Sequence, residues 1–409
     1  MSKDAKNVPA LRFKGYSDAW EKRKLGEVVE RVTRKNRDLV STRPLTISAQ
    51  DGLVDQRKFF SKTVASKNIS NYFLLKAGDF AYNKSYSVGY PWGAVKRLDK
   101  YPSGVLSTLY IVFKPKKINS QFLVTYFEGT TWYVSVSKVA SEGARNHGLL
   151  NISASDFFDQ QLFFPTKKTE QESIGLTIKV LDDLIAATQD KIDALEQAKK
   201  ALLQRLFDQS WRFKGYSDPW EKRKYGDIAK SFQYGLNAPA KKFDGINKYL
   251  RITDIDDLTR LFKQESLTSP DTNLSNASTY LLKQGDVLFA RTGASTGKTY
   301  KYRKGDGKVY FAGFLIRADL KPKFDSEFFY QTTLTDSFLD FVKVTSQRSG
   351  QPGINSKEYA NKAIQVPELS EQQRIGSVLA IYDNLIAATQ SRLSSLELLK
   401  KALLQDLFI

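Results

Sequence analysis

Hydrophobic positions recur every three or four residues in two stretches of the chain, 169–208 and 370–409. The stripe comprises Ile178, Leu181, Ile185, Thr188, Ile192, Leu195, Leu202 and Leu206 in the first stretch and Leu379, Tyr382, Ile386, Thr389, Leu393, Leu396, Leu403 and Leu407 in the second. So narrow a stripe is typical of a coiled-coil helix. At about 1.5 Å per residue each helix would extend about 57 Å, too long for one small domain. We therefore predict two long helices that pack against each other.

Each predicted helix begins with a hydroxyl residue that is followed three positions later by Glu or Gln. Thr169 precedes Glu172 in this way, and Ser370 precedes Gln373. Side chains at this spacing can satisfy the free backbone amides of a first helical turn. We therefore expect Thr169 and Ser370 to cap the two helices at equivalent points.

A lysine interrupts each stripe, Lys199 in the first stretch and Lys400 in the second. A helix with 3.6 residues per turn drifts against a repeat of 3.5 residues. We therefore expect the packing seam to shift at these places onto Ala198 and Leu399.

The chain repeats itself about 200 residues apart. Residues 12–27 read RFKGYSDAWEKRKLGE, and residues 212–227 read RFKGYSDPWEKRKYGD. Each copy is followed by a segment of mixed sequence, called a head from here on, that ends at a proline just before a long helix. The predicted boundaries are 1–168 for the first head, 169–208 for its helix, 209–369 for the second head and 370–409 for its helix.

The repeat has a geometric consequence. If a pseudo-two-fold axis relates the halves, the long helices run antiparallel and the heads lie at opposite ends. The segment around Leu11 should then lie against the end of the second helix, as the segment around Trp211 follows the first. The chain would be nearly circular in space.

The heads are rich in aromatic residues and mix two kinds of pattern. Alternating runs at 104–115 and 308–322 predict strands, while 120–130 and 326–342 predict helices. We therefore expect an α+β fold, in which two similar heads with mostly antiparallel sheets are separated by two long antiparallel coiled-coil helices.

The composition narrows the possible functions. There is no cysteine and only one histidine, His147, which excludes disulfides, thiolate nucleophiles and histidine or cysteine metal sites. We found no apolar run long enough for a membrane span and no leader-like start, so we expect a cytoplasmic protein that does not contact the membrane. Lysine and arginine exceed aspartate and glutamate by 63 − 44 = 19, which favours a polyanionic partner such as DNA.

A glycine-bearing loop in each head is a candidate for DNA contact. In the second head the loop reads RTGASTGKT, residues 291–299, and its three-residue glycine spacing is one short of a nucleotide-binding phosphate loop. Such a loop can instead approach DNA closely, with Arg291 and Lys298 reaching phosphate or a guanine edge. The first head has Lys84, Tyr86, Tyr90 and Trp92 at the corresponding place.

A second pair of polar, glycine-containing loops precedes the long helices, at 142–148 and 347–355. Arginine, asparagine and glutamine can make paired hydrogen bonds to guanine or adenine. The candidate DNA-binding residues are Lys84, Tyr86, Tyr90, Arg145 and Asn146 in the first head and Arg291, Thr292, Lys298, Arg348 and Gln351 in the second. No pair of carboxylates recurs at a catalytic spacing, so no catalytic residue is predicted.

The motifs together resemble those of the specificity subunits of type I DNA restriction-modification systems. The resemblance rests on KAGDFAYNKS and KQGDVLFARTGASTG in the heads, the pairs Glu170–Gln171 and Glu371–Gln372, and the ending KKALLQ of both helices. It covers nearly the whole chain. The duplicated stretch from the Glu–Gln pair to KALLQ is its most specific part.

The resemblance implies a protein that is not an enzyme and holds no cofactor. Each head would be a target-recognition domain that reads one half of a bipartite, asymmetric site in double-stranded DNA, and the paired helices would set the spacer. Two methyltransferase subunits that use S-adenosylmethionine would dock on the helices and methylate adenine. Two restriction subunits, which translocate DNA and use ATP and magnesium, would complete the complex on the nucleoid in the cytoplasm.

Two other functions remain open from the sequence. The chain could be a coiled-coil scaffold that binds nucleic acid without sequence preference, or a nucleotide hydrolase that uses residues 291–299. Competition with random DNA at fixed salt separates the first alternative from a specificity protein. An ATPase assay of a Lys298→Ala variant tests the second.

Overall fold

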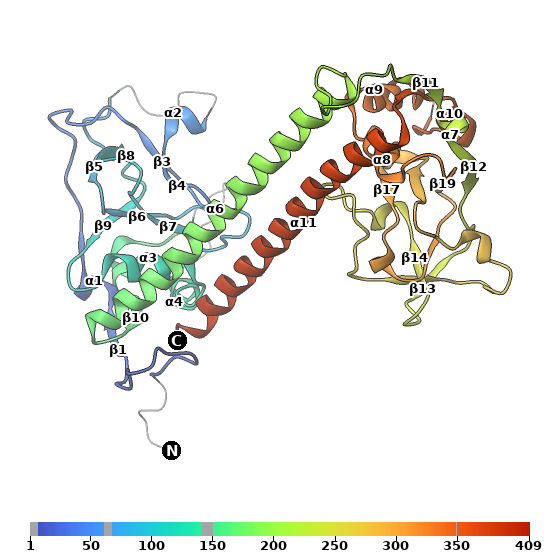
Figure 1. The fold of residues 1–409 in the computed structure, drawn as a ribbon. Helices are drawn as coiled ribbons and strands as arrows, with labels where there is room; N and C mark the ends of the chain where they lie inside the picture. The colour runs from blue at the N-terminus through green and yellow to red at the C-terminus, as the bar shows by residue number, and fades with distance from the viewer. Residues whose placement is uncertain (1–6, 61–67, 141–149, 349) are drawn as a thin grey trace. The chain divides into compact units, whose positions relative to one another are not determined.

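The computed structural model describes residues 7–60, 68–140, 150–348 and 350–409. The chain divides into two compact units. Unit 1 contains Met1–Ala187 and Leu393–Ile409, and unit 2 contains Thr188–Arg392. Each unit therefore holds one head together with parts of both long helices, α6 (Lys168–Phe207) and α11 (Leu369–Asp406) (Figure 1).

The head of unit 1 is built on an antiparallel four-stranded sheet. Its strand order is β2 (Val29–Arg31), β9 (Ile111–Pro115), β6 (Phe80–Asn83) and β7 (Ala94–Arg97). Three strand pairs surround it: β1 (Glu21–Lys24) with β10 (Gln161–Phe164), β3 (Leu45–Ser48) with β4 (Gly52–Asp55), and β5 (Phe73–Lys76) with β8 (Ser103–Leu106). Its short helices are α1 (Leu25–Val28), α2 (Gln56–Phe59), α3 (Ser120–Glu128), α4 (Tyr133–Val139) and α5 (Ala154–Phe158).

The head of unit 2 repeats this plan. The central antiparallel sheet has the order β12 (Ala229–Tyr234), β19 (Leu315–Leu320), β16 (Val287–Ala290) and β17 (Thr299–Lys301). The strand pairs are β11 (Glu221–Lys224) with β20 (Ala363–Val366), β13 (Ala240–Lys242) with β15 (Thr268–Pro270), and the parallel pair β14 (Lys248–Leu250) with β18 (Val309–Phe311). The helices are α7 (Tyr225–Ile228), α8 (Ser326–Thr332), α9 (Asp336–Thr345) and α10 (Ser356–Asn361), with short 3-10 turns η2 (Ile252–Asp254), η3 (Ser278–Tyr280), η4 (Gly293–Ser295) and η5 (Lys304–Asp306). The predicted α+β fold with mostly antiparallel sheets is confirmed.

Aromatic side chains fill the core of each head. In the first head the ring of Tyr82 stacks on Phe157 at a centroid distance of 4.6 Å, and both side chains are fully buried. In the second head Phe289 packs on Tyr359 at 4.7 Å, and both are again fully buried. This aromatic packing holds the central strands in place, and so it also fixes where the loops that follow these strands begin.

A buried ion pair joins each head to the start of a long helix. The guanidinium of Arg12 donates to both carboxylate oxygens of Glu170, at 2.7 and 2.9 Å, and Arg212 binds Glu371 in the same way, at 3.0 and 2.7 Å. The hydrogen bond to its glutamate raises the pKa of each arginine. Trp220 adds a third donor to Glu371, at 3.2 Å.

The glutamine that follows each of these glutamates makes two further bonds. Gln171 donates to the carbonyl of Pro165 and accepts the amide of Asn119, both at 2.8 Å. Gln372 donates to the carbonyl of Pro367 at 2.8 Å and accepts the amide of Asp325 at 3.0 Å. The Glu–Gln pair thus binds the first turn of the long helix to the head.

The helices begin at Lys168 and Leu369, one residue before the predicted caps. Thr169 and Ser370 therefore lie inside the first turn, and the prediction that they cap the helices is wrong. The contacts of the Glu–Gln pairs fix the helix starts instead.

The seam between the helices also differs from the prediction at the two lysines. Lys199 stays on the seam and contacts Asp383 at 2.6 Å. Lys400 likewise stays there and contacts Glu128 at 2.8 Å and Asp182 at 2.5 Å. Leu399 is 47% exposed and Ala198 is exposed, so the seam does not shift onto them. Acidic residues from the facing elements neutralise the lysines and keep the register.

The long helices run antiparallel within each unit. In unit 1 the first turns of α6 share a core with Leu407 and Phe408, which directly follow α11, while Asp182, further along α6, contacts Lys400. In unit 2, Leu206 near the end of α6 shares a core with Ile375 near the start of α11. The antiparallel arrangement predicted from the repeat is confirmed.

The N-terminal segment lies against the last turn of α11 in unit 1. The amide of Leu11 donates to the carbonyl of Asp406 at 2.9 Å. In unit 2 the amide of Trp211 makes the equivalent bond to Arg205, at 3.1 Å, where the chain is continuous. Leu11 therefore lies beside the end of the second long helix, as the repeat predicted.

Candidate nucleic-acid interface

The two candidate loops of the second head lie against each other. Thr292 pairs with Gly353 in an isolated antiparallel bridge, and the amide of Gly293 donates to the carbonyl of Pro352 at 2.9 Å. The amide of Ile354 donates to the carbonyl of Arg291, also at 2.9 Å. A single surface is thus formed by segments about 60 residues apart in sequence.

In the first head the first candidate loop contacts the segment that precedes α5. Lys84 follows β6 as Arg291 follows β16, so the two residues are equivalent. The carbonyl of Lys84 accepts the amide of Leu150 at 2.9 Å, and its ammonium donates to the carbonyl of Ile152 at 3.2 Å. The sequence predicted the two loops of the second head but not that they meet.

Arg291 lies between two aromatic rings. Its guanidinium lies over Tyr234, 4.9 Å from the ring centroid, and over Phe314 at 5.9 Å. Burial acts to raise the pKa of Tyr234, but the hydrogen bond from the Ser356 amide and the charge of Arg291 lower it overall. Among the described residues no carboxylate forms an ion pair with Arg291.

Lys298 points into the domain and not toward a ligand. Its side chain is buried, its ammonium donates to the carbonyl of Ile255 at 3.2 Å, and it forms an ion pair with Asp257. The hydrogen bond from Lys298 lowers the pKa of Asp257. The expectation that Lys298 reaches DNA does not fit this placement, because its charge is already used inside the fold.

The other candidates of the second head are on the surface. Arg348 is exposed, but its guanidinium donates to the carbonyls of Thr345 and Gln347 at 2.7 and 2.9 Å and binds Glu358. Gln351 is exposed beside Gly293, where an added Cβ would lie 3.0 Å from its amide nitrogen. Gln351 therefore remains a candidate for base contact, while Arg348 would first have to leave its partners.

In the first head the candidate loop lines a cavity. Tyr86 is 59% exposed, and Tyr90 is half-buried with the ammonium of Lys96 at 5.9 Å from its ring centroid. The cavity has a volume of about 280 Å³, and its lining includes Gln50, Phe59, Asn83, Tyr86 and Tyr90. Trp92 packs on the core, and its carbonyl accepts the hydroxyl of Tyr82 at 2.8 Å. Arg145 and Asn146 lie outside the described residues.

Three surface residues beside the loops were not predicted from the sequence. Phe314 is 56% exposed, and Leu109 occupies the equivalent position in the first head and is 66% exposed. Tyr234, at the end of β12, is 37% exposed. Apolar residues next to strands suggest core positions, so the sequence carried no signal that these side chains face outward.

A model of the type I restriction modification DNA specificity domain matches residues 217–398. These residues include most of the second head, with its two joined loops, and most of α11. Over these residues the chain is similar to the specificity subunits of type I restriction-modification systems.

Two proteins named as specificity subunits are each similar to about half of the chain. The chain is 24% identical over 195 residues to the type I restriction enzyme MjaVIII specificity subunit of Methanocaldococcus jannaschii, covering 47% of this chain and 42% of that protein. It is 26% identical over 201 residues to the putative MjaX specificity subunit of the same organism, covering 47% and 46%. The matched region thus spans less than half the length of either relative.

A solved structure shares the fold of the whole chain. The S subunit of a type I restriction-modification system from M. genitalium superposes with a TM-score of 0.66 at 16% sequence identity. The match covers 98% of this chain and 99% of that chain. The fold expected of a specificity subunit is therefore confirmed.

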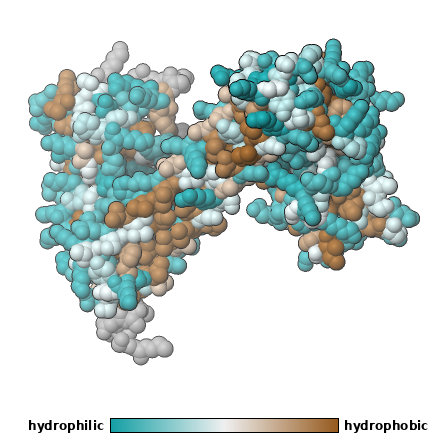
Figure 2. All heavy atoms as spheres, in the orientation of Figure 1, coloured by the Kyte–Doolittle hydropathy of each residue, from teal (hydrophilic) through white to brown (hydrophobic). Residues whose placement is uncertain are grey.

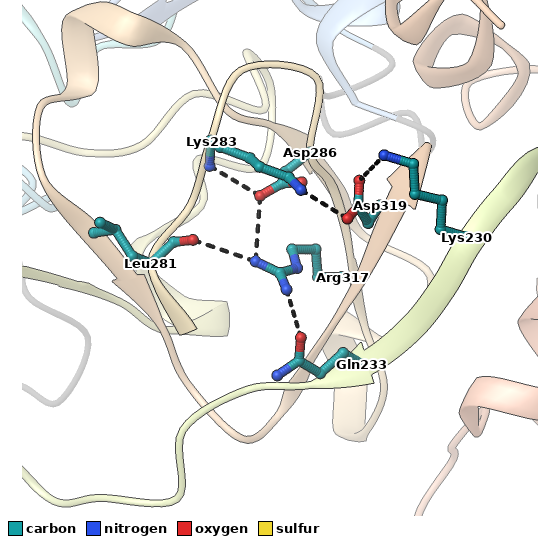
Figure 3. Close-up of polar contacts among 7 residues, drawn as sticks. All are labelled: Lys230, Gln233, Leu281, Lys283, Asp286, Arg317 and Asp319. Carbon is teal, nitrogen blue, oxygen red and sulfur yellow. Dashed lines mark hydrogen bonds and ion pairs between the residues drawn. The ribbon is translucent and has the colours of Figure 1, made fainter. Parts of the chain in front are cut away.

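A buried aspartate holds the turn that leads to each candidate loop. Asp286 accepts the amide of Lys283 at 2.9 Å and faces Arg317, which donates to the carbonyl of Leu281 at 3.2 Å and to Gln233 (Figure 3). Lys283 also binds Asp319 at 2.7 Å. Burial raises the pKa of Asp286 to about 6.

The first head contains the same turn with a different arginine. Asp79 accepts the amide of Lys76 at 2.8 Å and the guanidinium of Arg34 at 2.6 Å, and Arg34 also donates to the carbonyl of Leu74 at 3.0 Å. Arg34 follows β2, whereas Arg317 lies in β19. The Gly–Asp motif of both heads is thus structural, and it fixes the strand that leads to Lys84 or Arg291.

The described part of the chain offers no site for a metal ion made by three or more histidine, cysteine, aspartate or glutamate side chains. Within the same residues, no helix has both the length and the hydropathy needed to span a membrane.

Proposed function

We propose that this chain is the non-catalytic DNA-specificity subunit of a type I restriction-modification complex and directs both methylation and restriction. The observation that supports this best is a shared plan with different side chains: the same strand order places Lys84 and Arg291 at equivalent positions, and the carbonyl of each accepts an amide from the segment before a short helix. Phosphate contacts position a protein on DNA, whereas side chains on such loops read bases.

Each head reads one half of a bipartite, asymmetric site in this proposal. The equivalent residues Lys84 and Arg291 differ, as do Leu109 and Phe314. Two readers with the same scaffold and different contact residues suit two unlike half-sites. The net charge of +19 supplies the general attraction to the DNA backbone.

The long helices carry exposed apolar residues that suit the docking of partner subunits. Figure 2 shows apolar side chains gathered along these helices. In unit 1, Leu176, Val180 and Leu184 of α6 are 58%, 47% and 39% exposed, and in unit 2 Ile381 and Leu385 of α11 are 56% and 45% exposed. We call these residues the apolar stripes.

The two stripes are equivalent in the repeat, since Val180 corresponds to Ile381 and Leu184 to Leu385. Two equivalent surfaces fit two copies of one partner. We assign them to two methyltransferase subunits, which bring S-adenosylmethionine and act on a flipped adenine. Two restriction subunits with ATP and magnesium complete the nuclease form of the complex.

Mapping of methylated adenines across the genome tests the proposed function. Cells with and without this gene are compared while the methyltransferase subunit is shown to be expressed. We expect one split, asymmetric motif to lose its methylation when the gene is removed. Unchanged methylation would contradict the proposal and favour the scaffold that binds nucleic acid without sequence preference.

A further inference from the structure

Among the cations of the candidate loops in the second head, Arg291 differs in its surroundings. Lys298 is neutralised by Asp257 and Arg348 by Glu358. Arg291, in the described structure, has aromatic neighbours and no acidic one: Tyr234 at 4.9 Å and Phe314 at 5.9 Å from its guanidinium. Its charge is therefore available to a ligand.

The backbone around Arg291 is fixed on both sides. Its amide donates to the carbonyl of Phe314 at 3.0 Å, and its carbonyl accepts the amide of Ile354 at 2.9 Å. The hydroxyl of Tyr234 accepts the amide of Ser356 at 3.1 Å, which holds that ring to the second loop. The rings restrict the guanidinium plane, so little side-chain freedom would be lost on binding.

The surroundings of Arg291 favour a base edge over a phosphate. A planar guanidinium makes two parallel hydrogen bonds to O6 and N7 of guanine in the major groove. Phe314 is 56% exposed beside it, and an apolar ring gains little next to a phosphate but fits against base edges and the thymine methyl group.

We propose that Arg291 reads a guanine in the half-site bound by the second head, with Tyr234 and Phe314 as positioning residues. This inference rests on the proposed function. The first head has no equivalent arrangement, because Lys84 donates to the carbonyl of Ile152 and Leu109 replaces the ring of Phe314. The guanine contact therefore belongs to the second half-site alone.

The test uses the full chain in complex with its methyltransferase subunits. Binding is measured to the bipartite site found by methylation mapping and to DNAs in which each base pair of both half-sites is replaced in turn. For Arg291→Ala we expect a loss of roughly 5- to 150-fold on the cognate site and equal binding of all bases at one guanine position. Arg291→Lys keeps the charge but not the paired donors, so it should lose the same discrimination.

The positioning role is tested with two variants of Phe314. Phe314→Leu, which introduces the residue found at Leu109, should weaken discrimination at that one guanine, and Phe314→Tyr should restore it. Lys357→Ala is the matched control, because Lys357 is an exposed cation on α10 of the same head. We expect this control to leave discrimination at every position unchanged. Melting temperatures confirm that each complex is folded.

Two results would overturn the inference, and they are distinguishable. In the first, Arg291→Ala weakens binding equally on all sequences and reduces the slope of the logarithm of the binding constant against the logarithm of the salt concentration by about one. Arg291 then contacts phosphate, and the proposed function stands. If the wild-type complex itself shows no preference for any bipartite site, the proposed function fails, and the inference fails with it.

Discussion

Gly376 lies in the first half of α11 where the helix meets the start of α8. A Cβ at this position would lie 2.8 Å from a carboxylate oxygen of Asp325 and 2.9 Å from the backbone nitrogen of Phe328. Gly175 of α6 is equally close to the backbone of Gln121 and Phe122, at 2.8 Å. Both glycines therefore allow the long helix to lie close to the first turn of a short helix of the head, and the hydrogen bonds of the Glu–Gln pairs hold it there.

Replacement of Gly376 by alanine should lower the free energy of unfolding of unit 2 by about 1–3 kcal/mol, because the backbone must move to admit the methyl group. Urea unfolding of the purified complex measures this change. Gly305→Ala is the matched control, since an added Cβ at Gly305 meets nothing within 4 Å. If both variants lower the free energy of unfolding equally, steric contact with α8 does not explain the effect of a side chain at position 376.

Asp286 gives unit 2 a specific dependence on pH. Its pKa is about 6 in the folded state against an ordinary 3.8, because burial disfavours the carboxylate. The folded state therefore binds the proton more tightly, and this contribution to stability is complete below about pH 4 and lost as the pH rises through 6. The difference in pKa corresponds to at most about 3 kcal/mol.

An Asp286→Asn variant tests this pH dependence, because asparagine keeps the shape of the side chain without titrating. Relative to the variant, wild-type unit 2 should lose stability between about pH 4 and pH 7. Unfolding in urea at several pH values measures the difference. A difference that stays constant across this range would contradict the assignment.

At the scale of elements, the sequence was sufficient where local patterns decide the structure. The three- and four-residue spacing of apolar positions predicted α6 and α11, and the alternation of apolar and polar residues predicted strands in 104–115 and 308–322. The prediction that the packing seam shifts at Lys199 was wrong, because the folded chain brings Asp383 opposite that residue and the sequence does not show this contact. The joined loops and the rings around Arg291 depend on such distant contacts too, so the sequence could supply candidate residues but not their grouping.

Charge introduced into the apolar stripes should remove partner subunits one at a time. Val180→Asp and Ile381→Asp each place a carboxylate where an apolar side chain is 47% or 56% exposed, and we expect at least about a tenfold loss of affinity at the altered stripe. Mass measurement of the assembled complex should find one bound methyltransferase instead of two. Gln197→Asp, at an exposed polar position of α6, is the matched control. Two bound partners in both variants would exclude the stripes as docking sites.

The length of the paired helices should set the DNA spacer. One helical turn inserted near both Ala187 and Ala388 adds about 5.4 Å, and the rise of DNA is about 3.4 Å per base pair, so the preferred spacer should lengthen by about one or two base pairs. The half-sites should stay the same. Binding to DNAs with graded spacers measures this, and Ala187→Ser with Ala388→Ser controls for changes at the same sites. An unchanged spacer would refute the role of the helices as a ruler.

For the whole molecule, the repeat predicts that the chain can be opened at another place. Residues 208–210 connect Phe207 to Trp211 in the continuous copy, and Ile409 and Leu11 occupy the positions of Asp208 and Trp211 in the other. A chain that joins Ile409 to Leu11 through Gln–Ser and starts at Trp211 should keep the same target. Methylation mapping checks this outcome, and a changed motif would show that the two junctions are not equivalent.

The first and last strands of each head are partners. Glu21 of β1 pairs with Phe164 of β10, and Glu221 of β11 pairs with Val366 of β20 in the same antiparallel register. A head is thus a cassette whose two ends are hydrogen-bonded side by side, so its interior can change without moving the points of attachment. The flanking sequences are nearly identical in both halves. Under the proposed function, recombination that exchanged one head for another would therefore change one DNA half-site and leave the rest of the complex unaltered.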